Sequence, residues 1–440
     1  MKILLPAFLG LFCVNGWLFS QQSIQRDSTV IKKIESLEEF VKKSSRLKIT
    51  GWAQAQFQLT DSVGAKTFDG GDFASNSNNR FMIRRGRVKF NYTHDIVQAV
   101  LQLNATERGV NLVEFFGKIS DPWTKSLSFT MGVMNRPYGF EIQQSSSDRE
   151  TPERARFTQV LLPNERDLGA MISFQPVKES KLFGLKIDAG LYNGVGIAVP
   201  GTTSLNGAGI VDFDKYKDFI GRVHYKKAFK NDKYTLGIGI SHYNGGVLYQ
   251  NNRVYNEITT NSSGIMTWNM RDTTSGVLFK GGKSPRIYFG GDIQFSLKSI
   301  LGTTTLRGEY ITGTQTGTVD ENKSPGALPS KADSYQRSFN GGYVYFIQRI
   351  WKSKHEIALK YEWYDPNSKI SSSDMVIGST FTKAELKYSM IGLGYNFYLN
   401  EHVKFMAYYN LVKNETATGI VGFGKDLNDN VLTLRIQYRF

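Results

Sequence analysis

The sequence predicts an all-β fold, a sixteen-stranded antiparallel transmembrane β-barrel of the porin type with long extracellular loops and a short N-terminal periplasmic helix. Three observations predict it. Residues 430–440 alternate polar with apolar side chains and stop on Phe440, a period of two that only an extended strand can use. After the N-terminus no apolar run of about 18 residues occurs, which excludes helical membrane spans. From residue 47 onward, short and long links alternate between period-two segments, as in a barrel with one periplasmic rim.

Composition agrees with this fold class. Hydrophobic residues make up 40% of the 440 residues and the mean hydropathy is -0.32, whereas aromatics reach 13% and there are 43 Gly. Such a composition suits the aromatic girdles and closely packed strands of a barrel. The formal net charge of +15 predicts anionic partners. The lone Cys, Cys13, lies in the leader, so no disulfide or thiol chemistry is expected in the mature chain.

The N-terminus precedes the barrel in two predicted segments. Residues 1–20 have the positive end, apolar stretch and small closing residue of a secretory signal peptide. Lipidation at Cys13 is disfavoured because the bulky Phe12 precedes it. Residues 21–46 are polar, without Gly, and carry apolar residues at helical spacing, so we expect a short periplasmic helix. It is interpreted as a frayed amphipathic leader, with a coil that associates subunits as the alternative.

The barrel is predicted over residues 47–440, where sixteen period-two segments fit strands. Their expected ranges are 47–59, 80–93, 96–107, 110–120, 126–135, 168–175, 183–193, 218–229, 232–244, 286–298, 302–312, 341–351, 354–365, 386–399, 402–413 and 429–440. The even-numbered links are tight turns and the odd-numbered links are, with one exception at 108–109, long and polar. A closed sheet pairs every backbone group within the bilayer, and a barrel this wide should enclose a water-filled lumen.

Side-chain parity separates the lipid face from the lumen. In 113–119, Val113, Phe115 and Ile119 are expected to face lipid, which leaves Glu114 and Lys118 inside. The same rule applied to every strand gives more basic than acidic side chains on the inner face. Beyond those discussed next, the inward basic residues proposed to line the lumen are Lys48, Lys118, Lys186, Arg222, Lys226, Arg307, Lys360, Lys404, Arg435 and Arg439.

The strand 80–93 carries the densest basic pattern. Val88 and Phe90 fix its lipid face, so Arg85, Arg87 and Lys89 form a ladder of about 7 Å steps that points into the pore. Such a row could pass an anion from site to site. The alternative is an ordinary solvated lumen wall. On the same parity Arg84 faces outward, near headgroups, at a subunit contact or beside a bulge, and the sequence does not choose among these.

The long link after the fifth strand is the second candidate. It carries acidic residues together with basic ones, and a loop of this length usually has a function. In wide barrels one loop often folds inward and narrows the channel, and guanidinium groups suit phosphate or carboxylate. The alternative is an external loop whose charges pair among themselves. The arginines predicted to form the constriction are Arg136, Arg149, Arg154, Arg156 and Arg166.

At these positions the chain resembles the phosphate-selective porin O and P family, in its Bacteroidetes-type form. The matching stretches are RFMIRRGRVKF (80–90), GVMNRPYGFE (132–141), NERDLG (164–169) and RIQYRF (435–440). The resemblance implies a homotrimer of sixteen-stranded barrels with an inward-folded third long loop and a basic lumen that favours anions. By this resemblance, Arg85, Arg87 and Arg136 are expected to lie on the anion pathway.

The predicted function is therefore that of an outer-membrane porin for passive diffusion of small hydrophilic solutes with anion preference, with phosphate or polyphosphate as candidate solutes. The alternative is a surface ligand-binding or adhesion barrel that acts through its long extracellular loops. We expect neither an enzyme nor a cofactor or metal, because the five His show no ligand spacing and no catalytic motif occurs. Expected partners are small anions, the lipid bilayer and lipopolysaccharide of a Gram-negative outer membrane, and like subunits, but no nucleic acid.

Overall fold

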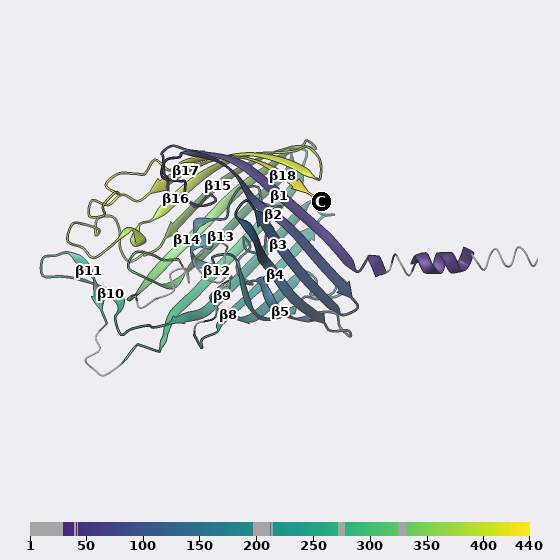
Figure 1. Cartoon of the computed structure of the whole chain (residues 1–440), viewed down its shortest axis with the longest axis horizontal. Coiled ribbons are helices and arrows are strands. Elements are labelled where there is room, and N and C mark those ends of the chain that lie inside the picture. The colour runs from purple at the N-terminus through teal and green to yellow at the C-terminus, as the bar shows by residue number, and fades with distance from the viewer. Residues whose placement is uncertain are drawn as a thin grey trace, which may run out of the picture.

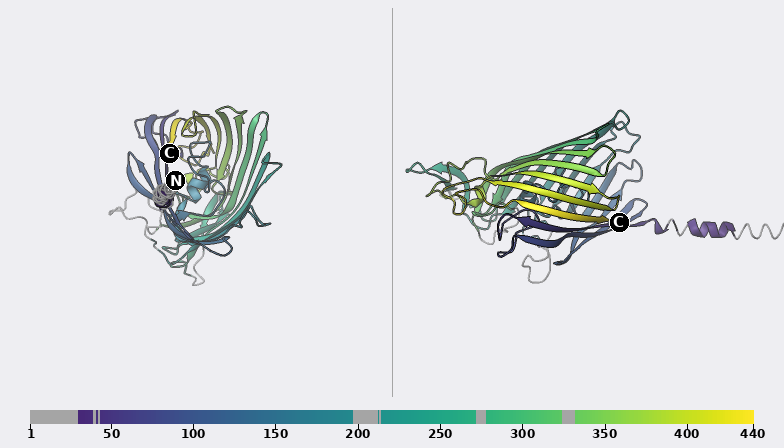
Figure 2. Two further views of the ribbon diagram at one scale, coloured as in Figure 1. Left: turned by 90° about the vertical axis from the view of Figure 1, so that its right-hand side faces the viewer. Right: turned by 90° about the horizontal axis from the view of Figure 1, so that it is seen from above.

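The wall of the molecule is a closed β-barrel (Figures 1 and 2). The computed structural model describes residues 30–38, 41, 43–196, 212, 214–271, 278–323 and 332–440, so the predicted signal peptide lies outside the described residues. The barrel closes because β1 (Leu47–Thr60) pairs antiparallel with β2 (Asn79–His94) on one side and with β18 (Val431–Arg439) on the other. The predicted all-β barrel is confirmed.

Sixteen strands form this wall. The sheet contains 18 strands, of which β10 (Val254–Thr260) and β11 (Met266–Met270) form a hairpin outside the ring, since β9 pairs directly with β12. The other wall strands are β3 (Val97–Thr106), β4 (Gly109–Ser120), β5 (Leu127–Asn135), β6 (Arg166–Phe174), β7 (Leu185–Tyr192), β8 (Asp218–Phe229), β9 (Tyr234–Leu248), β12 (Lys283–Ser299), β13 (Gly302–Gly317), β14 (Ser334–Ile350), β15 (His355–Asp365), β16 (Tyr388–Tyr398) and β17 (Val403–Asn414).

Several strands continue further toward the long loops than the sequence pattern predicts. β14 begins at Ser334 rather than at residue 341, and β13 ends at Gly317 rather than at residue 312. At their outward positions the extra residues carry Thr, Gln, Ser or Asn instead of apolar side chains. Apolar alternation marks only the part of a strand that contacts lipid, so the pattern ends before the hydrogen-bonded ladder does.

The long loops at the extracellular end pack into a second hydrophobic core. Trp268 of β11, Tyr335 of β14 and Phe381 belong to it, and Arg337 forms a fully buried ion pair of 2.6 Å with Glu385 of the short 3₁₀ helix η1 (Lys383–Glu385). Residues 245–285, predicted as one of the long polar links, contain the β10–β11 hairpin. The short turns and the C-terminus lie at the opposite end (Figure 1).

The segment before the barrel is helical over residues 30–38 and 43–44. It extends away from the barrel on the side of the short turns (Figure 1), and its apolar side chains Ile31, Ile34, Leu37 and Val41 are exposed. Whether it serves as a leader or as an association element stays a prediction. No helix in the described ranges is both long and apolar enough to cross a bilayer.

Side-chain parity holds along most of the wall but shifts at two β-bulges. Phe115, Phe129 and Leu434 are exposed on the outer face as predicted, and Arg435 on the inner face is buried. The β3–β4 register jumps between Gln102 and Leu103, which leaves Val113 without a strand partner. Val113 is buried and lines a lumen cavity, so the prediction that it faces lipid is wrong.

Candidate functional site

A bulge in β2 brings two consecutive arginines to the inside of the barrel. Gln54 of β1 lies opposite Arg85, but the next residue, Ala55, lies opposite Ile83, so Arg84 is the extra residue. Arg84 donates hydrogen bonds of 2.7 and 2.8 Å to the Glu153 carboxylate, and Arg85 donates one of 2.8 Å to it. Among the three positions left open for Arg84, the structure selects the bulge. Bulges of this kind commonly re-aim side chains at functional sites.

The other two members of the predicted ladder lie further along the same strand. Arg87 lies over the Trp52 ring at 5.7 Å, and no hydrogen-bond partner of its Nε occurs among the described residues. Lys89 forms an ion pair of 2.9 Å with Glu114 of β4, and its side chain is 32% exposed. Arg85, Arg87 and Lys89 thus share the inner face, with the least buried member nearest the short turns.

The link 136–165 folds into the lumen. Its side chains and backbone contact β1, β9, β13, β15, β16, β17 and β18 through groups on the inner face. Two wall carboxylates hold it there, and a third, Glu141, orders the loop itself. Glu309 accepts 3.0 Å hydrogen bonds from the backbone N–H groups of Phe140 and Glu141, and Glu362 accepts one of 3.1 Å from Arg156. Glu141 accepts hydrogen bonds from the Ala155 backbone N–H and the Thr158 hydroxyl, which orders the start of α2 (Arg156–Leu161).

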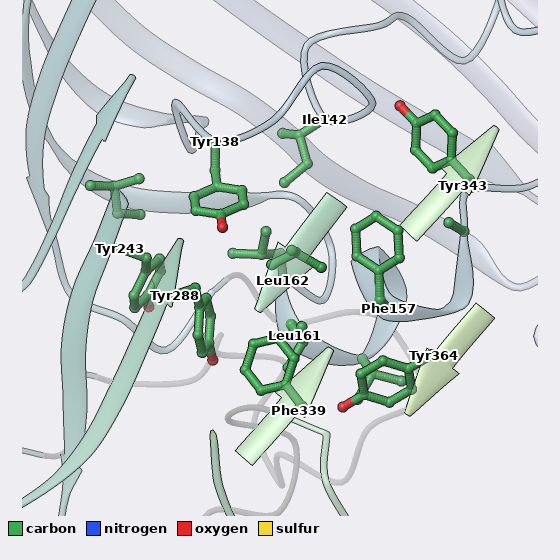
Figure 3. Packing of buried hydrophobic residues seen from close by; sticks show 14 of the residues in the cluster. Tyr138, Ile142, Phe157, Leu161, Leu162, Tyr243, Tyr288, Phe339, Tyr343 and Tyr364 are labelled. Atoms are coloured by element: carbon green, nitrogen blue, oxygen red, sulfur yellow. The ribbon is translucent and has the colours of Figure 1, made fainter. Parts of the chain in front are cut away.

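One side of this loop is packed in a hydrophobic core rather than surrounded by water (Figure 3). Phe157 of α2 stacks on Tyr343 with ring centroids 6.1 Å apart, and Tyr138 meets Tyr288 edge-on at 6.4 Å. Most of the core's wall members lie from β8 to β15, and Met134 of β5 and Tyr192 of β7 also belong to it. The members from β8 to β15 are Ile220, Tyr243, Tyr288, Ile311, Phe339, Tyr343, Tyr345, Ile347, Ala358 and Tyr364. On this side of the barrel, side chains of the loop and of the wall fill the interior in place of water.

The predicted constriction arginines serve different roles. Arg154 donates to Glu165 and to the Glu141 carbonyl, and Arg166 forms an ion pair of 3.1 Å with Glu114. Both line a lumen cavity. Arg136 is completely buried and donates to the Pro163 carbonyl at 2.8 Å, so it joins the two ends of the loop instead of facing water.

Two further loop arginines also lie away from the cavities. Arg156 lies between the Phe68 and Tyr388 rings, at 4.5 and 4.2 Å. Arg149 is buried, and none of its guanidinium nitrogens has a hydrogen-bond partner among the described residues. Neither side chain contributes to the lining of the two lumen cavities.

The remaining predicted lumen residues mostly hold the loop and wall together. Arg435 donates to the Pro152 carbonyl at 3.0 Å and to Glu153 at 3.2 Å. Arg307 pairs with Glu150 at 3.1 Å, and Arg222 bonds Asp292 through two nitrogens. Arg439 pairs with Asp148 at 2.9 Å at the short-turn rim, where its side chain is half exposed. Lys118 lies on β4 opposite Thr130.

Two adjoining cavities occupy the space between the loop and the wall of β2–β4. They have volumes of about 160 Å³ and about 140 Å³ and share Arg84, Arg85, Asn164 and Glu165 in their linings. Together they are lined by the basic side chains Arg84, Arg85, Arg87, Arg154, Arg166 and Lys323, and by the acidic side chains Glu153 and Glu165. This surplus of guanidinium groups suits a small anion with two or more oxygens.

Sequence reasoning missed three parts of this site. Glu153 was predicted only as one of the acidic residues of the long loop, whereas its carboxylate forms ion pairs with Arg84, Arg85 and Arg435. Val113 reaches the smaller cavity because of the bulge in β4, which leaves no signal in apolar alternation. Asn104 and Asn111 also line that cavity. The inward parity of Asn104 was readable from the sequence, whereas Asn111 shares the parity of Phe115 and lies inside because of the same bulge.

Comparison with known proteins supports the fold and the family. The model of the family described as phosphate-selective porin O and P matches residues 269–440. The anion-selective porin from Comamonas acidovorans is 12% identical with a TM-score of 0.52, over 90% of this chain and 99% of that one. The outer-membrane channel DcaP of Acinetobacter baumannii is 12% identical with a TM-score of 0.51, over 90% of this chain and 97% of that one.

No curated protein matches the chain. At 12% identity the two structures establish a common barrel fold, whereas the family match rests on the C-terminal part of the sequence. That family consists of channels and not of enzymes. Residues 269–440 thus match the phosphate-selective porin O and P family, and the chain as a whole has the fold of an outer-membrane porin barrel of Gram-negative type.

Proposed function

We propose that this porin conducts small hydrophilic solutes passively across the outer membrane and favours anions, with phosphate as the candidate solute. The observation that carries the proposal is the lining of the two adjoining lumen cavities, where six basic side chains meet two acidic ones. A positive lining lowers the barrier for an anion and raises it for a cation. The half of the lumen from β8 to β15 is filled by the loop core, so the proposed path runs along β2–β4.

The order of basic groups suggests a direction for this path. Lys323 belongs to an extracellular loop and lines the larger cavity together with Arg84 and Arg85. The smaller cavity adds Arg87, and Lys89 follows two residues later on the same strand toward the short turns. Alternate residues of a strand are about 7 Å apart. An anion could therefore move from one group to the next without crossing an uncharged gap.

The two glutamates in the lining also favour passage of an anionic solute over its tight retention in the cavities. Glu153 already bonds Arg84 and Arg85, and Glu165 already bonds Arg154 and Arg166. A solute must share these guanidinium groups with a resident carboxylate. Conduction needs binding that is strong enough for admission and weak enough for release, and partial neutralisation serves that balance.

Reversal potentials in planar bilayers test the proposal. Under a KCl gradient the pore should give a steady conductance with a chloride-biased reversal potential, and added phosphate should reduce the chloride current in a saturable manner. A cation-biased potential would refute anion preference. Chloride bias without any effect of phosphate would retain the anion channel and remove phosphate as its solute.

The packed extracellular loops favour a second candidate, a surface barrel that binds a ligand or another surface. The core around Trp268, the buried Arg337–Glu385 pair and the β10–β11 hairpin give these loops a defined shape. Ordered loops are better suited to binding than unstructured ones. Bilayers that stay silent after confirmed insertion of the protein would support this candidate and contradict the channel.

We also propose a homotrimer, as the family resemblance implies. An apolar groove of about 430 Å³ on the outer face of β1, β2 and β16–β18, lined by Ala55, Phe57, Phe81, Phe405 and Ile436 among others, is consistent with a neighbouring subunit. Light scattering of the detergent-solubilised protein should give three times the chain mass after subtraction of detergent. A mass of one chain would overturn the trimer.

A further inference from the structure

The periplasmic rim is divided into two chemically different halves. The four turns between β6–β7, β8–β9, β12–β13 and β14–β15 are neighbours in the barrel and, together with the strand ends beside them, carry nine exposed lysines with two exposed acidic residues, Glu179 and Asp232. We call these lysines the basic rim: Lys178, Lys181, Lys226, Lys227, Lys230, Lys233, Lys298, Lys352 and Lys354. Lys226 and Lys298 are strand residues with the inner-face parity of Arg222 and Asp292, and the other seven lie at the turns or on the outer face. The other three turns, between β2–β3, β4–β5 and β16–β17, carry Lys125 against Asp95, Asp121 and Glu401, with Lys48 and Arg439 exposed on the strand ends beside them.

Backbone hydrogen bonds join the four turns of the basic rim into one surface. The Lys226 N–H donates to the Gly184 carbonyl at 2.9 Å, and the Lys298 N–H donates to the Lys233 carbonyl at 2.9 Å. The Trp351 N–H donates to the Leu301 carbonyl at 2.7 Å. Because each bond links adjacent turns, the lysines form one continuous band along the rim.

None of the nine lysines forms an ion pair within the part of the chain that the structure describes, whereas the basic side chains of the lumen are mostly paired. Lys227 lies 5.6 Å from the Phe229 ring, and Lys230 and Lys233 lie 5.7 and 5.6 Å from the Tyr234 ring. These contacts hold ammonium groups beside aromatic side chains and leave their charge available to a partner.

Exposed apolar side chains accompany this charge. Leu182, Phe183, Ile300, Leu301 and Trp351 at the turns are all at least half exposed. Tyr234 stacks on Phe295 just above, with ring centroids 6.3 Å apart. A band that combines lysines with aromatic and aliphatic side chains at a membrane rim matches the boundary between headgroups and acyl chains.

We propose that the basic rim binds anionic phospholipid headgroups of the inner leaflet, and that the β6–β15 half of the barrel is the half that faces lipid. The opposite half has a different rim, with more acidic than basic side chains at its turns. Charge complementarity selects phosphate-bearing lipids over a second copy of this chain, because two basic rims repel each other. This inference is independent of what the lumen conducts.

Brominated lipids provide the test, because bromine quenches tryptophan fluorescence at short range and Trp351 lies within the basic rim. The full-length mature protein is reconstituted in phosphatidylcholine vesicles that contain brominated phosphatidylglycerol or, separately, brominated phosphatidylcholine. The signal of Trp351 is the difference between wild type and Trp351→Phe. We expect stronger quenching by phosphatidylglycerol, and a preference that declines as salt rises.

The decisive variant is Lys227→Gln with Lys230→Gln and Lys233→Gln. Its matched control is Lys280→Gln with Lys369→Gln and Lys425→Gln, which removes three exposed extracellular charges. A lysine near an anionic surface contributes about fivefold in binding, so the rim variant should lose at least about fivefold of the lipid preference and the control should keep it.

Three outcomes would overturn the inference. The first is equal quenching of wild type by the two lipids. The second is an equal loss of the preference for phosphatidylglycerol in the rim variant and in the control variant. The third is a rim variant that keeps its lipid preference while its oligomeric state changes. The last result would assign the rim to subunit contact. Circular dichroism and heat-modified gel mobility confirm that each variant is folded before the lipid measurement.

Discussion

Arg87→Gln should weaken anion preference without unfolding the barrel. Arg87 lines the smaller lumen cavity and lies over Trp52, and it forms no ion pair within the described part of the chain. Its removal therefore leaves no buried carboxylate unpaired. Arg85 is less suitable, because its loss would leave Glu153 with fewer partners, and breaking a buried ion pair is strongly destabilising.

The magnitude follows from the charge and its distance to a passing anion. Two unit charges about 4 Å apart interact by about 1 kcal/mol at the dielectric constant of water and by about 4 kcal/mol at an effective value of 20. The cavity is open to solvent, so the lower value applies. About 1 kcal/mol corresponds to roughly a fivefold change in the anion-to-cation permeability ratio.

Reversal potentials under a KCl gradient measure this ratio, with Arg253→Gln as the matched control. Arg253 is an exposed extracellular arginine paired with Asp333 at 2.7 Å, so its variant removes the same charge outside the cavities. A permeability ratio for Arg87→Gln that stays within twofold of wild type would refute the proposed path. An equal decrease in the control would assign selectivity to overall charge.

Three further variants test the loop and a turn. Gly139→Ala should destabilise the loop by about 1–3 kcal/mol, because Gly139 has a φ of 57° and an added Cβ would clash with the Glu309 carboxylate; a melting temperature equal to wild type would contradict this. Phe157→Ala should reduce the free energy of unfolding by about 3–5 kcal/mol in urea titrations, since Phe157 is buried against Tyr343; a smaller change than that of an exposed Phe81→Ala would count against the lumen core. Asp121→Asn should lower stability most at neutral pH: hydrogen bonds from the backbone N–H groups of Leu127, Thr124 and Ser126 and from the Thr124 hydroxyl lower the pKa of Asp121, so its contribution is fully present above the unfolded value of about 3.9, declines below that value and is lost only as the pH falls through the lowered pKa of the folded state. The free energies of unfolding of wild type and Asp121→Asn in urea should therefore differ more at pH 7 than at pH 3, and an equal difference at both would contradict this.

The barrel wall was predictable because one property, contact with lipid on alternate residues, repeats along every strand. Apolar residues such as Leu432, Leu434 and Ile436 fixed both the strand and its inward face. The hairpin β10–β11 lies outside the bilayer, where no lipid imposes alternation, and it was predicted only as part of a long polar link. Strand ends near Gly317 and Ser334 were missed for the same reason.

The site was predictable only in part, because it depends on two local shifts and on contacts between distant residues. The ladder of Arg85, Arg87 and Lys89 followed from parity. Arg84 joined it through a bulge, which changes parity without changing composition. The pairing of Glu153 with Arg435 joins residues 282 positions apart, and the packing of Phe157 on Tyr343 likewise joins loop to wall. Neither is visible in local patterns.

The aromatic packing of the inserted loop determines what kind of motion the channel can use. Swinging this segment out of the barrel would expose Tyr138, Phe157 and Leu161 together with the wall rings beneath them, at about 1.5–3 kcal/mol for each large side chain. The inserted loop should therefore stay in place while the channel conducts. If the conductance closes under voltage or acid, the groups that move should be side chains beside this loop or the extracellular loops above it, and the cross-section of the barrel should stay constant.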